Sequence, residues 1–250
     1  MSTEYRLITI PPSHYCEKAR WALDRVGVSY REEGHPPLLH LRAVKAAGGV
    51  SSTPVLVTDD DVLSDSTDIL QYLDAKYTDA WRPYPMDSDL RVECEELEDV
   101  FDTRLGPHTR RVAYFHLLPQ RKLLTEAVSP GVGRGELVTF KILLPVVRWL
   151  MRRSMNITPV SAQRSLDRVR TVFEMVAERL VGGRRFLIGD RFTAADLTFA
   201  ALAAPVLLPR NYGSVLPALD AVPAEYLALI EEFRSLPAGA FALRMYRDLR

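Results

Sequence analysis

The sequence has very little cysteine, with only Cys16 and Cys94 among its 250 residues. Two cysteines are too few for the disulfide framework of a secreted protein, and they fit a reducing compartment. The first ten residues, MSTEYRLITI, lack the basic start and long apolar stretch of a secretory signal peptide. We therefore expect a cytoplasmic protein whose thiols are free.

The chain also lacks net charge and a long hydrophobic run. Its 32 Lys and Arg residues balance 32 Asp and Glu residues, so overall charge gives no reason to expect nucleic acid or an anionic membrane as a partner. The most apolar segment, LVTFKILLPVVRWLM at 137–151, is interrupted by Lys141, Pro145 and Arg148. It is shorter than the roughly 20 apolar residues that a membrane span needs. We expect a packed helix there and no integral membrane segment, with a peripheral membrane contact as the lesser alternative.

Several motifs that carry chemistry are missing. The sequence contains no G-x-G-x-x-G, no phosphate-binding P-loop, no H-E-x-x-H and no G-x-S-x-G. Its five histidines do not pair with one another or with cysteine at the spacing of metal ligands on one face. We therefore expect no metal site. The histidines are His14, His35, His40, His108 and His116.

The first third of the chain alternates between β-rich and helical patterns. Its order predicts β-α-β-α-β-β-α, a small mixed sheet covered by helices. The first crossover requires a parallel strand pair, and the acidic turn in TPVLVTDDDVL implies an antiparallel hairpin. The expected strands cover 5–10, 28–33 and two pieces of 53–63, and the expected helices cover 15–26, 38–47 and 66–77.

Beyond TDAWRPYPMDS at 78–88 the patterns change, because no convincing strand follows. We expect a domain at 1–80, a linker at 81–88 and an all-helical domain at 89–250. In GDRFTAADL, Thr193 followed by Asp196 predicts a capped helix start. The expected helices of this part cover 89–118, 120–128, 136–153, 161–181, 193–208 and 223–234.

Three local features are candidates for chemistry. Ser13 in PPSHYC lies at the turn before a helix, where free N–H groups and the helix dipole favour an anion. Thr53-Pro54 opens a strand. Asp65-Ser66 opens another helix, where free N–H groups would hold a carboxylate and Asp65 would hold an ammonium. From spacing alone, Ser13 and Asp65 are explained as helix N-caps, and Thr53-Pro54 as an ordinary trans bond.

In order and spacing these features form a recognisable set. SHYCEKARWALDRVGVSYREE, STPVL and LSDSTDILQYLD resemble the N-terminal thioredoxin-like domain of the cytosolic glutathione transferases. The helical remainder, with GDRFTAADL, is similar to the C-terminal domain of that family. The resemblance covers nearly the whole chain and is most specific at 13–77 and 186–202.

The resemblance implies that Ser13 activates glutathione, since it stands seven residues before Arg20. Thr9 stands near the place of the tyrosine that other classes use. It also implies a cis bond between Thr53 and Pro54, with the backbone of Thr53 pairing with the cysteinyl part of glutathione. A thiol with a pKa near 8.5 needs about 2.7 kcal/mol of preferential anion stabilisation to lose about two pKa units. One hydrogen bond to a charged group supplies roughly 1.5–3 kcal/mol.

The resemblance further implies that Asp65 and Ser66 hold the γ-glutamyl end of glutathione. A basic residue before or in the second helix usually meets the glycyl carboxylate, and His40 and Lys45 are the candidates. The thiolate would attack a small electrophile between the domains, where Arg110 and Tyr114 are candidate lining residues beside the alternatives of core or surface roles. A homodimer is expected by analogy with the family.

Two other functions remain open. Cys16 ends a tetrad that would be a C-x-x-C redox motif if Ser13 were cysteine, so a glutathione-dependent thiol or peroxide reductase is one alternative. Cys16 falls on the apolar face of the expected helix, which favours a buried, unreactive thiol. A non-catalytic ligand-binding or scaffold protein of the same fold is the other alternative.

Overall fold

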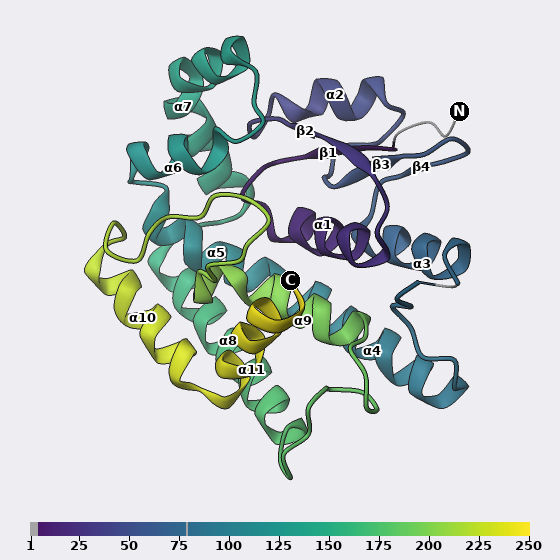
Figure 1. Cartoon of the computed structure of the whole chain (residues 1–250). Helices are drawn as coiled ribbons and strands as arrows, with labels where there is room; N and C mark the ends of the chain where they lie inside the picture. The colour runs from purple at the N-terminus through teal and green to yellow at the C-terminus, as the bar shows by residue number, and fades with distance from the viewer. Residues whose placement is uncertain (1–4, 79) are drawn as a thin grey trace.

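The computed structural model describes residues 5–78 and 80–250. A four-stranded sheet has the order β2-β1-β3-β4 (Figure 1). β1 pairs with β2 in parallel, and the pairs β1–β3 and β3–β4 are antiparallel, so the predicted crossover and hairpin are confirmed. The strands are β1 (Tyr5–Thr9), β2 (Tyr30–Gly34), β3 (Val55–Val57) and β4 (Val62–Leu63).

Helices cover both faces of this sheet. α1 (His14–Val26) and α3 (Ser66–Lys76) lie on one face, and α2 (His40–Ala46) lies on the other (Figure 1). Alternate residues of β1 supply the two cores, because successive side chains of a strand point to opposite faces. Leu7 packs in the core that contains α1 and α3, whereas Ile8 packs with Val44 of α2.

The rest of the described chain is helical. α9 is its central element and packs against α1, α4, α5 and α11. Every residue of α9 except Pro205 is buried. The predicted helix start is confirmed, since the Asp196 carboxylate accepts bonds from the backbone N–H and the hydroxyl of Thr193, both at 2.8 Å. The helices are α4 (Ser88–Arg104), α5 (Gly106–Leu117), α6 (Arg121–Val128), α7 (Arg134–Ser154), α8 (Pro159–Arg179), α9 (Ala194–Leu207), α10 (Ala224–Ser235) and α11 (Pro237–Leu249).

One prediction about this part was wrong, and one helix was missed. The single helix expected at 89–118 is broken between α4 and α5. Pro107 has no N–H for the bond back to Thr103, and its ring crowds that carbonyl, so a continuous helix is disfavoured. α11 was not predicted at all, although Pro237 at its first turn is a normal start signal.

None of the helices in the described ranges, 5–78 and 80–250, is long and apolar enough to cross a membrane. The boundaries of the two expected domains and of the linker at 81–88 stay predictions. Helix α3 ends at Lys76 and α4 begins at Ser88, and the segment between them contains no helix or strand in its described residues.

Candidate functional site

Ser13 is the N-cap of α1. Its backbone is extended, with φ −71° and ψ 125°, and its Oγ accepts a long bond of 3.5 Å from the N–H of Cys16. The residue is half-buried. The cap uses the serine oxygen only weakly and leaves the hydroxyl hydrogen available, so Ser13 has the chemistry to donate a hydrogen bond at a helix N-terminus.

A polar cavity of about 680 Å³ lies beside this helix start. The Thr53–Pro54 peptide bond is cis. Asp65 caps α3 by accepting from the N–H of Thr67 at 2.7 Å, and Ser66 is buried in the first turn. Four of the predicted glutathione residues line the cavity together, namely Thr53, Pro54, Asp65 and Ser66.

The floor of the polar cavity is a buried ion cluster. The Lys18 ammonium of α1 lies 2.8 Å from a Glu98 oxygen and 2.7 Å from an Asp102 oxygen, and it donates to the Thr67 hydroxyl at 2.9 Å. Burial by itself would lower the pKa of Lys18, but the two carboxylates raise it overall. Glu98, Asp102 and Thr67 all line the cavity, so the cluster joins α1, α3 and α4 directly beneath it.

Cys16 is fully buried in α1. Burial raises the pKa of its thiol, and Arg20 together with the Ser13 and Thr53 side chains opposes that effect. Ser13 and Thr53 therefore lie near the same sulfur, on two segments far apart in sequence. A buried thiol with a raised pKa is a poor nucleophile, which agrees with the expectation of an unreactive cysteine.

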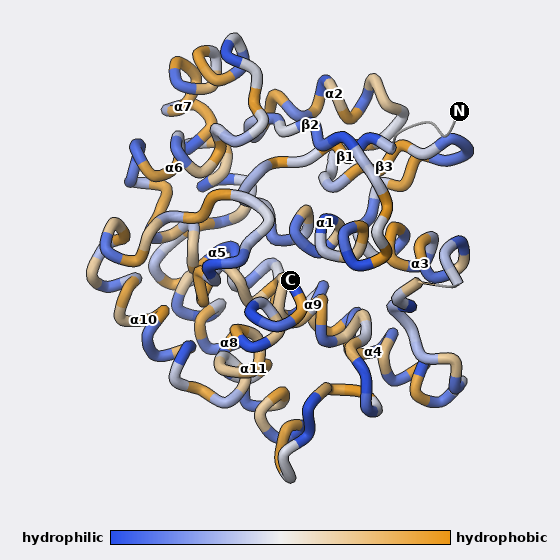
Figure 2. Tube along the Cα trace, in the orientation of Figure 1, coloured by the Kyte–Doolittle hydropathy of each residue, from blue (hydrophilic) through white to orange (hydrophobic). Residues whose placement is uncertain are grey.

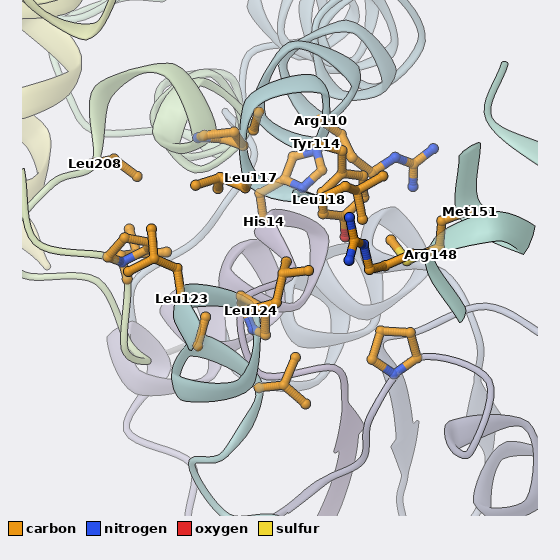
Figure 3. Close-up of a pocket in the computed structure, with 18 of the residues that line it drawn as sticks. His14, Arg110, Tyr114, Leu117, Leu118, Leu123, Leu124, Arg148, Met151 and Leu208 are labelled. Atoms are coloured by element: carbon orange, nitrogen blue, oxygen red, sulfur yellow. The ribbon is translucent and has the colours of Figure 1, made fainter. Parts of the chain in front are cut away.

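A second cavity, of about 80 Å³, lies between α5, α6, α7 and α9 (Figure 3). Its lining is mainly aliphatic. Both predicted second-substrate residues, Arg110 and Tyr114, line it. Arg110 also lines the polar cavity, so the two cavities meet at this side chain. The aliphatic and aromatic lining includes Leu117, Leu118, Leu123, Leu124, Val128, Phe140, Leu144, Val147, Met151, Leu208 and Tyr226.

His14 stands beside Ser13 and lines the apolar cavity. Its Nε2 is 3.0 Å from the carbonyl oxygen of Gly106. Burial, with a further contribution from the Arg110 guanidinium, lowers the pKa of His14 to about 3. The imidazole is therefore neutral at physiological pH, and its Nε2–H donates to the Gly106 carbonyl.

The remaining residues considered from the sequence, His40, Lys45 and Thr9, lie outside the described linings of both cavities. His40 Nε2 is 3.2 Å from the carbonyl of Ser51, next to Ser52, which does line the polar cavity. Thr9 is buried, and its hydroxyl donates to Glu32 at 2.6 Å.

Sequence reasoning missed several residues of the two cavities. Tyr15 lines the polar cavity and donates to the Asp102 carbonyl at 2.8 Å, and Lys18 lies behind the lining, in contact with Glu98 and Asp102. Arg148 of α7 lines the apolar cavity. The one available signal for Arg148 was its interruption of the apolar segment at 137–151. Within the described residues no group of three or more His, Cys, Asp or Glu side chains is arranged to hold a metal ion.

Comparison with known proteins matches the chain to one family. The sequence profile of the glutathione S-transferase N-terminal domain matches residues 7–81, and that of the C-terminal domain matches residues 144–229. Mouse glutathione S-transferase theta-2 is 28% identical over 174 residues. That match covers 69% of this chain but only 58% of the mouse protein.

Two solved structures show the same fold. Glutathione transferase GSTFuA3 from Phanerochaete chrysosporium superposes with a TM-score of 0.65 at 17% identity, covering 100% of this chain and 98% of its own. A glutathione S-transferase from Methylobacterium radiotolerans, in complex with glutathione sulfonate, has a TM-score of 0.54 at 18% identity, with coverage of 96% and 95%. The thioredoxin-like sheet, the helical remainder and the two family profiles agree, and the chain therefore belongs to the glutathione S-transferase family.

Proposed function

We propose that this protein is a serine-type glutathione transferase, which activates the thiol of glutathione and directs it at a small electrophile. The supporting observation is that Ser13 caps α1 between residues of the two linings: Pro12 and His14 line the apolar cavity and Tyr15 lines the polar one, while Ser13 itself belongs to neither described lining. Glutathione would occupy the polar cavity with its sulfur toward Ser13. We also propose, from the family and from the buried free cysteines, a cytoplasmic homodimer.

Each proposed contact has a chemical reason. Thr53, held by the cis bond to Pro54, would pair through its backbone with the cysteinyl part of glutathione. At the start of α3, the Asp65 carboxylate would hold the γ-glutamyl ammonium. The Ser66 hydroxyl would donate to the carboxylate of the γ-glutamyl group. Ser13 would donate to the thiolate. The sulfur would form a bond to an electrophilic carbon, the leaving group would depart with the bonding pair, and the thiol proton would go to solvent.

The electrophile would bind in the apolar cavity, against Tyr114 and Arg110. Burial raises the pKa of Tyr114, Arg110 opposes that effect, and Cys16 adds to it. The Tyr114 hydroxyl is therefore neutral and lies near both Arg110 and the start of α1. The Tyr114 hydroxyl would donate a hydrogen bond to a substrate held between the two cavities.

The glycyl carboxylate of glutathione would reach the edge of the polar cavity near α2. We propose Lys45 and His40 as its candidate partners, because Lys45 is an exposed cation and His40 lies next to Ser52 at the rim. Lys45→Met and His40→Gln separate the two. The variant that removes the true partner weakens glutathione binding but leaves the binding of γ-glutamylcysteine, which has no glycine, unchanged.

Calorimetry with glutathione tests the proposal. The wild-type protein is expected to bind one glutathione per chain. Asp65→Ala should bind it more weakly, and Asp87→Ala, which removes the N-cap of α4 outside both cavities, serves as the matched control. Absence of any binding by the wild-type protein would favour the non-catalytic alternative.

The reductase alternative depends on Cys16. Cys16→Ser should leave conjugation of a chloronitrobenzene to glutathione within about twofold of the wild-type rate, because the thiol is buried and has a raised pKa. A thiol or peroxide reductase activity that disappears in Cys16→Ser would instead establish the alternative.

A further inference from the structure

Two arginine side chains face the apolar cavity without a partner. Arg148 of α7 and Arg110 of α5 both line it, and Figure 3 shows the Arg148 guanidinium among the lining side chains and the Arg110 guanidinium extending outward from them. Within 5–78 and 80–250, neither side chain makes a hydrogen bond or a salt bridge, and the Arg148 Nε is buried. By contrast, the buried Arg20 guanidinium is held by Glu32, Glu17 and the Pro11 carbonyl.

On the side of the apolar cavity no anion lies near these arginines, whereas the polar cavity that Arg110 also lines contains Glu98 and Asp102. The lining of the apolar cavity contains no Asp or Glu, and its one histidine, His14, is neutral. A buried cationic N–H without an acceptor carries an unfavourable desolvation cost. The planar guanidinium group matches the two oxygens of a carboxylate better than any other protein cation does. A ligand that brings a carboxylate would therefore satisfy this part of the cavity.

We infer that the apolar cavity binds compounds with an aryl or alkyl body and one carboxylate, and that Arg148 and Arg110 hold the carboxylate. The role of this site in a reaction rests on the proposed transferase function. In that reaction the preferred electrophile is an amphipathic anion. Arg148 is the more diagnostic residue, because Arg110 also faces the polar cavity.

Binding in the absence of glutathione tests this site. The probes are 4-chloro-3-nitrobenzoate and 4-chloro-3-nitrobenzamide, which differ mainly in the charge of one substituent, and equilibrium dialysis measures their dissociation constants. The wild-type protein is expected to bind the carboxylate about tenfold more tightly or better. Arg148→Met should remove that preference, Arg148→Lys should restore part of it, and Arg164→Met, an exposed arginine on α8, should leave it intact.

Equal binding of the two probes by the wild-type protein, or binding of neither, would overturn the inference. A preference that persists in Arg148→Met and in Arg110→Met would overturn it as well. The transferase proposal fails separately, because a protein that does not bind glutathione can still show the carboxylate preference.

The outer face of α7 supports a second inference independently. Val138, Ile142, Val146 and Trp149 recur every three or four residues and are 57%, 72%, 52% and 61% exposed. The opposite face of the same helix is buried through Phe140, Leu144, Val147 and Met151. α7 accordingly carries hydrophobic residues along its whole length (Figure 2).

Basic residues lie along this exposed stripe. Arg134, Lys141, Arg152 and Arg153 are exposed, and the one acidic residue of α7, Glu136, is paired with His35 at 2.8 Å. A second copy of α7 on this face would bring like charges together without acidic partners. Exposed apolar and tryptophan side chains beside several cations are typical of helices that lie on anionic lipid surfaces.

We infer that the stripe formed by Val138, Ile142, Val146 and Trp149 docks on an anionic bilayer surface, although the net charge of the chain is zero. The test is sedimentation with vesicles of phosphatidylcholine alone or mixed with phosphatidylglycerol. The mixed vesicles should carry down the wild-type protein and blue-shift its tryptophan fluorescence. The double variant Ile142→Gln/Trp149→Gln should stay in solution, and Val92→Gln, an exposed valine of α4, should sediment.

Failure of the wild-type protein to bind the mixed vesicles would overturn this second inference. So would equal sedimentation of the double variant. If the wild-type protein and Val92→Gln self-associate but the double variant does not, the stripe would instead be a contact with a second copy of the chain.

Discussion

The two cavities that meet at Arg110 are built in opposite ways. The polar cavity is assembled from chain turns, namely the cis bond before Pro54 and the start of α3 at Asp65, over the ion cluster around Lys18. The apolar cavity is assembled from side chains on α5, α6, α7 and the C-terminal end of α9. Backbone groups and charges therefore shape the first cavity, and hydrophobic packing shapes the second.

This difference assigns different tasks to the two cavities. A cavity with fixed turns and helix starts suits one constant ligand with several charges, because its donors and acceptors are held by the backbone. A cavity made of Leu, Val, Met and Phe side chains accepts varied apolar bodies, since its shape depends on side-chain volume alone. Under the proposed function the two ligands would react near Arg110, which lines both cavities, and near Ser13, which directly precedes His14 of the apolar lining.

The largest effect is expected from breaking the floor of the polar cavity. Lys18→Met would leave the Glu98 and Asp102 carboxylates buried without their cation, at a cost of about 3–5 kcal/mol in the free energy of unfolding. Urea denaturation measures it. Lys122→Met, which removes an exposed lysine, should cost less than about 0.5 kcal/mol. A small loss for Lys18→Met would show that the ion cluster does not hold α1, α3 and α4 together.

A smaller, pH-dependent effect is expected at the boundary of the two cavities. The pKa of His14 is about 3 in the folded protein and 6.5 when unperturbed, so the unfolded state binds the extra proton between these values. Stability from neutral His14 is present above pH 6.5 and is lost as pH falls toward 3. Between about pH 7 and about pH 4.5 this amounts to about 2–3 kcal/mol.

His14→Gln provides the matched variant, because glutamine keeps an N–H donor for the Gly106 carbonyl and does not titrate. Urea denaturation of both proteins at the two pH values should give a smaller loss for the variant. Identical losses would mean that His14 titrates normally and that its surroundings are more polar than the structure shows.

The third prediction concerns Gly106, the first residue of α5 after its break from α4. A Cβ on Gly106 would lie 2.3 Å from the Tyr15 hydroxyl oxygen and 2.7 Å from the ring carbon that carries it. Gly106→Ala should therefore displace Tyr15 from the polar cavity and cost about 1–3 kcal/mol. Gly135→Ala, with open space around it, is the control. Glutathione affinity should fall in Gly106→Ala, and unchanged affinity would show that Tyr15 does not shape the cavity.

The sequence identified four lining residues of the polar cavity, Thr53, Pro54, Asp65 and Ser66, and two of the apolar cavity, Arg110 and Tyr114. Ser13, Thr53-Pro54 and Asp65-Ser66 are local features, and each is recognisable from a few neighbouring residues. Lys18 was not predicted, because its partners Glu98 and Asp102 lie about 80 residues further along the chain, on α4. Arg148 was visible only as an interruption of an apolar segment, since the lining of the apolar cavity depends on how helices pack.

The fold shows the same limits. The order of strands and helices along the first third of the chain follows from local patterns, as does the capped start of α9. Both were predicted correctly. The break at Gly106-Pro107 was missed because the apolar pattern continues through it, although Pro107 disfavours a continuous helix. α11 was missed because it packs on α9, and its burial is a tertiary property.

The ionisation of bound glutathione tests the central proposal most directly. Ultraviolet absorbance of the thiolate, titrated against pH, gives the pKa of the bound thiol in the wild-type protein and in Ser13→Ala. The proposal predicts a pKa about two units below that of the free thiol in the wild-type complex, and a return most of the way in Ser13→Ala. Equal thiolate absorbance in the two complexes at every pH would contradict the assignment of Ser13.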